Sequence, residues 1–189
     1  MASKVQICNL ALIKIGESII TSLTDNTERA KACNIIFDDM ADEVMSEGPW
    51  TSAVARAKLN QLSDTPNHGF SYQYQLPTDP YCLKVLRIDE DLDGLYEYKI
   101  EGSKLLTDLT SVNIEYIGRI EDTEQYDVDL KKAIISRLAA ELSYRFTGSA
   151  SVTEKLIQEY KENLANGLSN NNQQGSIDIV NNDTYTDVR

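Results

Sequence analysis

Apolar residues recur at intervals of three and four in two segments near the start of the chain, which is the spacing of an amphipathic helix. In residues 3–16 they are Val5, Cys8, Leu12 and Ile15, and in residues 27–47 they are Ala30, Cys33, Phe37, Met40 and Val44. Gly16 stands where a glycine ends a helix, and Asp25 or Asn26 is placed to cap the second helix. The other face of the second segment is acidic, and we interpret it as solvated surface.

From Phe70 the period changes to two, which is the spacing of a strand whose two faces differ. Short alternating segments follow one another, namely residues 70–76, 82–88, 95–100, 103–107 and 111–117. Turn sequences such as DLDG and EGS separate them at short intervals, so we expect an antiparallel meander. Six of the ten tyrosines lie in this region, and we attribute them to half-buried strand packing rather than to a face that binds sugars or bases.

Helical spacing returns after residue 127. The stripe of residues 128–147 is made of Leu130, Ile134, Leu138 and Leu142. Gly148 is placed to end this helix, and Ser151 or Thr153 to open the last one. The sequence therefore predicts an α+β protein. We expect a helical bundle from residues 1–66 and 121–170, an inserted antiparallel β-meander lobe from residues 67–120, and an extended C-terminal tail from residues 171–189.

The segment EGPWTSAVARAKL, residues 47–59, contains the only tryptophan of the chain. Gly48 could adopt the positive φ that ends a helix, and Pro49 fits the first position of a following helix. Trp50 would then fill the wedge between two helices, and the alanines after it would allow another backbone to approach closely. Arg56 would pair with a nearby carboxylate or reach a neighbouring subunit, and the intramolecular pair is the favoured reading. We interpret the segment as a structural joint.

The C-terminal tail contains four large apolar residues close together, Ile177, Ile179, Val180 and Tyr185. Disordered termini are poor in such residues, and the alternation in SIDIV is typical of a strand. A strand added to the sheet edge of another protein would satisfy its backbone groups, so these residues are candidates for docking on another protein or on a neighbouring copy. An ordinary frayed end explains them equally well.

Composition excludes several classes of function. Eighteen basic and thirty acidic residues give a net charge of −12, which opposes nucleic-acid binding; the charge either serves solubility or repels DNA that slides past. Three cysteines without CxxC spacing and a single histidine, His68, argue against a disulfide framework and against a zinc site. No apolar run approaches the length of a membrane helix, and the N-terminus is periodic, unlike a signal peptide. We expect a soluble intracellular protein.

The sequence carries none of the common catalytic or phosphate-binding motifs, such as GxGxxG, GxSxG or HExxH. An acidic cluster, Asp89, Glu90, Asp91 and Asp93, invites a calcium-loop reading. It lacks the ligand order of an EF-hand and lies among strands rather than between helices, so we expect no metal there. We predict no catalytic residue, no cofactor and no enzyme activity.

The order of local sequences resembles the tail tubular protein A family, the head-to-tail adaptor proteins of tailed, above all short-tailed, bacteriophages. The resemblance runs from about Val5 to about Leu168 and rests on ICNLALIKIGE, GPWTSAVARAKL, YQYQLPTDPYCLKVLRI and the segment from VNIEYIGRI to YRFTG. Pro49–Trp50 with Arg56, followed by LPTDP, is its most specific part. Thr51–Ser52 departs from the Asn-Phe common in the family after the tryptophan. The tail after Asn170 resembles nothing in the family.

The resemblance implies a ring of twelve copies at the head–tail junction of a virion, assembled in the host cytoplasm. Its partners would be the portal protein, further copies of itself and a downstream tail or nozzle protein. DNA would pass through the ring without specific binding, and no membrane would be involved. An acidic DNA mimic that inhibits a DNA-binding enzyme is the alternative, although the acidic residues are spread over helices and loops. A hydrolase is the weakest hypothesis, since it needs a pocket of convergent carboxylates.

Overall fold

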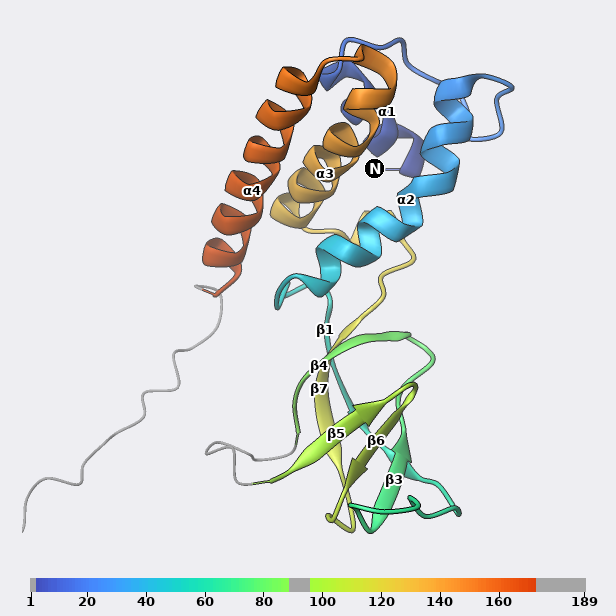
Figure 1. The fold of residues 1–189 in the computed structure, drawn as a ribbon, viewed down its shortest axis with the longest axis vertical. Helices are drawn as coiled ribbons and strands as arrows, with labels where there is room; N and C mark the ends of the chain where they lie inside the picture. Colours follow the sequence, from blue (N-terminus) through green and yellow to red (C-terminus); the bar gives the residue numbers. More distant parts are fainter. Residues whose placement is uncertain (1–2, 89–95, 173–189) are drawn as a thin grey trace, which may run out of the picture.

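The computed structural model describes residues 3–88 and 96–172, in which a β lobe is inserted between the second and third helices of a helical part (Figure 1). The helices are α1 (Lys4–Lys14), α2 (Glu28–Ser46), α3 (Val128–Thr147) and α4 (Ala150–Asn172), and the 3₁₀ turn η1 (Thr123–Gln125) precedes α3. The strands are β1 (Val54–Lys58), β2 (Asn60–Gln61), β3 (Tyr72–Gln75), β4 (Cys82–Ile88), β5 (Tyr98–Glu101), β6 (Lys104–Thr107) and β7 (Asn113–Gly118). The predicted α+β architecture is confirmed.

The helix ends follow local rules, with two corrections. One is at α4, which begins at Ala150, so neither Ser151 nor Thr153 opens it as expected. Gly16 ends α1 with a φ of 79°, and the amides of Gly16 and Glu17 donate back to the carbonyls of Ile13 and Leu12, which is a Schellman motif. Thr27 caps α2, since its side chain accepts from the amide of Ala30. The expected cap at Asp25 or Asn26 is wrong, because the Asp25 carboxylate accepts hydrogen bonds from Thr21 and Ser22 within the preceding turn.

The helical part encloses one apolar core, with α3 at its centre in contact with α1, α2 and α4. The predicted stripes of α1, α2 and α3 supply most of this core, and α4 adds Leu156, Tyr160, Leu164 and Leu168. Cys8 of α1 and Cys33 of α2 are both fully buried within it. The hydrogen bond to Cys33 and burial raise the pKa of the Cys8 thiol. Both cysteines are small side chains of the core.

The lobe consists of two antiparallel sheets with the strand orders β1-β7-β4 and β2-β3-β6-β5. The strands are antiparallel as predicted, but the order is not that of a meander. β7, the last strand of the insertion, lies between β1 and β4, because β1 enters the lobe at its first residue and pairs with the strand that leaves it. Leu59, between β1 and β2, carries the chain from one sheet to the other and is buried in the lobe core.

Residues 54–58 form strand β1, so the expected helix after Pro49 and the expected boundary at residue 66 are both wrong. β1 pairs with β7 over five residues, from Val54 opposite Ile117 to Lys58 opposite Asn113. Ala55 and Ala57 face the lobe core. Their small size reflects packing beneath a sheet rather than a close helix contact, and the lobe spans β1 to β7.

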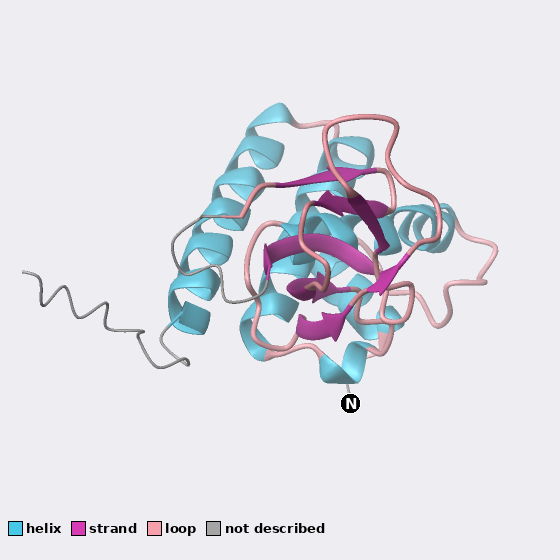
Figure 2. Ribbon diagram, turned by 90° about the horizontal axis from the view of Figure 1, so that it is seen from below, coloured by secondary structure: helices cyan, strands magenta, loops and turns pink. Residues whose placement is uncertain are grey.

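The sheet β1-β7-β4 belongs to both cores. Figure 2, seen from below, shows the strands of the lobe with helices behind them. On one face, Val54 and Ile117 pack against the helical core. On the other face, Ile114 and Tyr116 pack into the lobe core. Because successive strand residues point to opposite faces, a single sheet joins the two parts of the molecule.

Candidate functional site

Trp50 stands where the chain leaves α2 and enters the lobe, and its side chain is fully buried. Its indole Nε1 donates to the carbonyl oxygen of Val44, 2.8 Å away, in the last turn of α2. That carbonyl lies in the part of a helix where intrahelical donors run out. The ring therefore satisfies its own polar atom at the end of α2 while its apolar body fills the helical core, as expected of a structural joint.

Two glycines allow helix α4 to approach this ring. A Cβ at Gly167 would lie 2.9 Å from Cη2 and Cζ3 of Trp50, and a Cβ at Gly48 would lie 2.3 Å from Cδ2 of Leu168. Gly48 does not have the expected positive φ; it is required because α4 packs against it. Pro49 lies exposed in the loop before β1 and does not begin a helix. The close approach that was expected at the alanines therefore takes place between the joint and α4, at Gly48 and Gly167.

Polar contacts hold the residues after Trp50. The Asn171 side-chain oxygen accepts hydrogen bonds of 2.8 Å from both the amide and the hydroxyl of Thr51, and the Asn171 amide group donates to the carbonyl of Gly167. The Ser52 hydroxyl donates to Asp127, the residue that caps α3. Asn171 is 3% exposed and belongs to α4, so the expected start of the extended tail at residue 171 is two residues too early. The joint connects α2, β1, α3 and α4.

The sequence did not single out Gly167 or Asn171. Gly167 could have been noticed because it is a glycine inside a helical pattern, and such a glycine often marks a close backbone approach. Asn171 stands in the polar run SNNNQQGS, which gave no indication of burial. Its role follows only from the position of Thr51, which is 120 residues away in the chain.

Arg56 does not belong to the joint, because it lies on β1 with its side chain 77% exposed. It pairs with Glu115 of β7, as the intramolecular reading predicted: Nε of Arg56 donates to Oε2 of Glu115 at 3.1 Å. Arg87 of β4 donates to the same oxygen at 2.8 Å through Nη2. Burial of Glu115 works to raise its pKa, but the hydrogen bonds from Arg87 and Arg56 outweigh burial, and the pKa of Glu115 is lowered.

The outer face of the sheet β1-β7-β4 is basic beyond the residues that pack on the helical core, and one of its lysines, Lys84, donates to the carbonyl oxygen of Ser46 at the end of α2. Strand register places four exposed basic residues around Glu115: Arg56, Lys58, Lys84 and Arg87. We call these five residues the basic face. Only the Nε of Arg56 is bonded to Glu115 among the contacts within the described residues, so both of its terminal nitrogens face solvent. The basic face has a charge of +3 in a chain whose net charge is −12.

The sequence suggested that the acidic face of α2 is solvated surface, and this is wrong for Asp38, Asp42 and Glu43. Asp38 pairs with Lys4 of α1, and Asp42 pairs with Arg119 beyond β7. Glu43 pairs with Arg137 of α3, and Glu28 pairs with Arg145 of the same helix. These carboxylates tie α2 to its neighbours. Asp39 and Glu47 are exposed and have no ion pair within the described residues.

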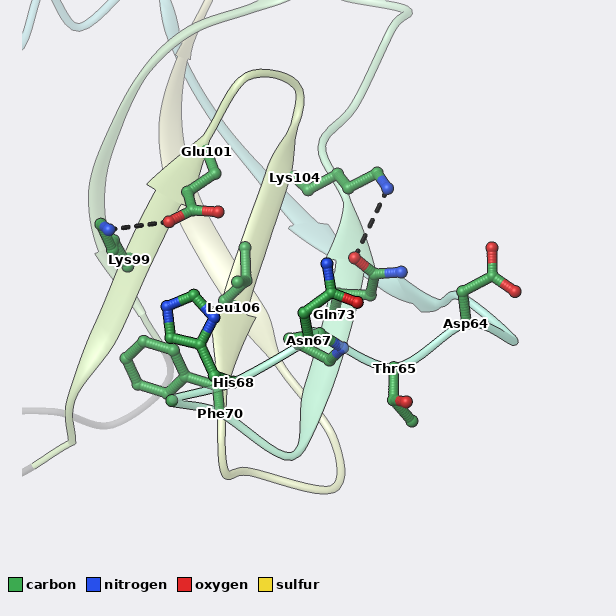
Figure 3. Close-up of a pocket in the computed structure, with 12 residues that line it drawn as sticks. Asp64, Thr65, Asn67, His68, Phe70, Gln73, Lys99, Glu101, Lys104 and Leu106 are labelled. Atoms are coloured by element: carbon green, nitrogen blue, oxygen red, sulfur yellow. Dashed lines mark hydrogen bonds and ion pairs between the residues drawn. The ribbon is translucent and has the colours of Figure 1, made fainter.

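A groove of about 670 Å³ lies on the lobe between strands β3, β5 and β6 and the loop of residues 64–70 (Figure 3). Lys99 pairs with Glu101 at 2.7 Å, and the Lys104 ammonium donates to the side-chain oxygen of Gln73 at 3.4 Å. His68 and Phe70 line the same groove. Its lining residues include no hydrogen-bonded nucleophile and base, so we assign no reaction to it.

Three further expectations concern metals, membranes and the tail. The described residues contain no group of three or more histidine, cysteine or carboxylate side chains arranged to hold a metal ion. None of the helices in residues 3–88 and 96–172 combines the length and apolarity needed to cross a bilayer. The tail candidates Ile177, Ile179, Val180 and Tyr185, and the acidic cluster at residues 89–93, lie outside the described residues.

Comparison with protein-family models and with curated protein sequences finds no match for this chain. The family resemblance therefore remains an expectation drawn from the order of local sequences.

Proposed function

We propose that this chain is a structural head-to-tail adaptor, which forms a ring under the portal of a tailed bacteriophage and links the capsid to the tail. The observation that carries the proposal is the interlocked joint of Gly48, Trp50 and Gly167. It fixes the lobe to the helical part through the same segment on which the family resemblance is most specific. A connector that transmits position between a portal and a tail needs such a stiff junction between its two parts.

The distribution of charge supports a role without chemistry. The net charge of −12 would be multiplied around a ring, and an acidic channel repels the DNA that must pass through it. The proposed assembly has about twelve copies, as the resemblance implies, and is located at the head–tail junction of the virion after assembly in the host cytoplasm. The portal and a downstream tail or nozzle protein are its proposed partners, and neither an enzyme activity nor a membrane is part of the proposal.

The alternative function, an acidic DNA mimic, has less support. A mimic needs a row of free carboxylates spaced like phosphates on one face. Four carboxylates of α2, the most acidic helix, are instead paired with cations of α1, α3 and the segment after β7. Paired carboxylates offer little charge to a DNA-binding enzyme.

The proposal is tested by mixing the purified full-length protein with portal particles and examining them by electron microscopy. Added density that closes a ring on one side of the portal is the expected result. Bare portal particles at saturating protein, or co-purification with a nuclease instead, would overturn the adaptor function.

Docking by the tail is tested with a truncation. The deletion should remove residues 173–189 and keep Asn171, because loss of Asn171 would disturb the joint. If Ile177, Ile179, Val180 and Tyr185 dock on the portal, the truncated protein binds portal particles more weakly while its melting temperature is unchanged. Equal binding by both forms would remove the docking role of the tail.

A further inference from the structure

Charge separation within the chain suggests how copies of it meet. The basic face collects four of the eighteen basic residues on one side of one sheet. Since its charge is +3 and the total is −12, the rest of the chain has a net charge of −15. Averaged over its surface, the rest of a second copy therefore has the opposite charge to the basic face.

The arginines of the basic face keep donors available. Both arginines that bind Glu115 use its Oε2, and Arg56 does so through Nε alone. The two terminal nitrogens of Arg56 are thus free to bind a carboxylate in the bidentate manner that guanidinium groups favour. Lys58 lies two residues further along β1 on the same side and is also exposed.

A carboxylate-rich surface is present on α2. Asp39, Glu43 and Glu47 follow one another at four-residue steps, which places them along one side of the helix. Glu43 is held by Arg137, whereas Asp39 and Glu47 are exposed and have no ion pair within the described residues. No basic residue occurs between Asp38 and Glu47. We call Asp39, Glu43 and Glu47 the acidic side of α2.

We propose that the basic face of one copy binds the acidic side of α2 of a second copy. The inference rests on the proposed ring and identifies the surfaces that build it. A two-fold contact centred on the basic face would place two basic faces against each other, and their like charges would repel. The charge pattern therefore favours a head-to-tail contact between two different surfaces, which is the type of contact that closes into a ring.

The experiment measures ring formation on portal particles by electron microscopy and sedimentation, at low and at high salt. The variant R56E/R87E should reduce ring formation at least about tenfold, because interfacial charges are reversed. Raising the salt concentration should weaken the wild-type ring, as screening predicts. The matched control K31E/K155E changes the net charge equally, at exposed lysines that have no ion pair within the described residues, and should assemble like the wild type.

Three further variants identify the acceptor and control for misfolding. D39K/E47K should fail to assemble, and the combined swap R56E/R87E/D39K/E47K should regain rings, because each contact again joins opposite charges. R56A/K58A keeps the pair between Arg87 and Glu115, so it should weaken assembly without disturbing the sheet even if R56E/R87E melts early. Thermal melting of each variant separates misfolding from loss of contact.

The outcomes separate this inference from the proposed function. If the wild type forms no ring on portal particles, the adaptor function fails. If the wild type and R56E/R87E form rings equally, only the present inference is overturned. Rescue of R56E/R87E by reversing Asp89, Glu90, Asp91 and Asp93 instead of α2 would overturn the assigned acceptor. DNA binding that is lost in R56E/R87E while rings persist would overturn the assigned partner.

Discussion

The indole ring of Trp50 lies so close to Gly167 that a Cβ at residue 167 would be 2.9 Å from two ring carbons. Trp50 is at the start of the lobe and Gly167 is near the end of α4, so this contact closes the molecule across most of its sequence. The ring is fully buried and its Nε1 is held by Val44, which leaves it little freedom to move aside.

Gly167→Ala should destabilise the protein although alanine is the better helix former. Helix propensity alone would favour alanine by about 1 kcal/mol. The added methyl group meets a ring that cannot retreat, and overpacking of this kind costs about 1–3 kcal/mol. Chemical denaturation should show a lower free energy of unfolding for G167A. The control N166A, at the exposed neighbouring position, should be neutral or stabilising, and a G167A variant as stable as N166A would contradict the contact.

Gly48→Ala should also destabilise the protein, but by less, about 1 kcal/mol. Its new methyl group meets the Cδ atoms of Leu168, which are the end of a flexible side chain rather than a fixed ring. Shortening that side chain should relieve the clash. A double-mutant cycle with L168A should therefore show that G48A costs less in the L168A background. Additive effects of the two changes would argue against direct contact.

Asn171→Ala should cost about 1–3 kcal/mol, because a buried side chain that bonds the backbone and hydroxyl of Thr51 is lost. The effect should be visible as faster hydrogen exchange at the start of β1. Asn170→Ala is the matched control, since Asn170 is exposed and donates only to Asp129. Equal stability of N171A and N170A would show that the tail begins before residue 171 after all.

Glu115 should contribute stability that depends on pH. Its pKa is lowered in the folded protein by Arg87 and Arg56, so the stabilisation is present above the ordinary carboxyl pKa of about 4.3 and is lost as the pH falls below that value. The melting temperature of E115Q should therefore be lower than that of the wild type at pH 7, and the difference should shrink towards pH 3. The control D64N removes an exposed carboxylate without an ion pair within the described residues. A constant difference between E115Q and wild type across this range would contradict the ion pairs.

Much of the fold follows from local sequence. The stripe of residues 128–147 and the alternation of residues 82–88 predicted α3 and β4 with the bounds that are observed. The glycines after α1 and α3 were also interpreted correctly, since Gly16 and Gly148 adopt positive φ at the helix ends. These features depend on hydrogen bonds between residues close in the chain, and local pattern is sufficient for them.

Residues 54–58 show where local pattern is not sufficient. Five residues with three small or branched side chains fit a helix as well as a strand, and the flanking Gly48 and Pro49 favoured a helix. Residues 54–58 form a strand because they pair with β7, which lies about sixty residues later in the chain. Pro49 does not begin a helix as predicted, because the backbone after it turns toward the sheet.

The sequence by itself determined which segments are helical, where most of them end, that the lobe is antiparallel, and that Trp50 anchors a joint. The tertiary structure decided the strand order, the entry of residues 54–58 into the sheet, the fit of Trp50 against Gly167, and the gathering of Arg56, Lys58, Lys84 and Arg87 around Glu115. The physical reason is the range of the interactions. Helix caps and periodicity act within a few residues, whereas strand pairing and close packing join residues that only the folded chain brings together.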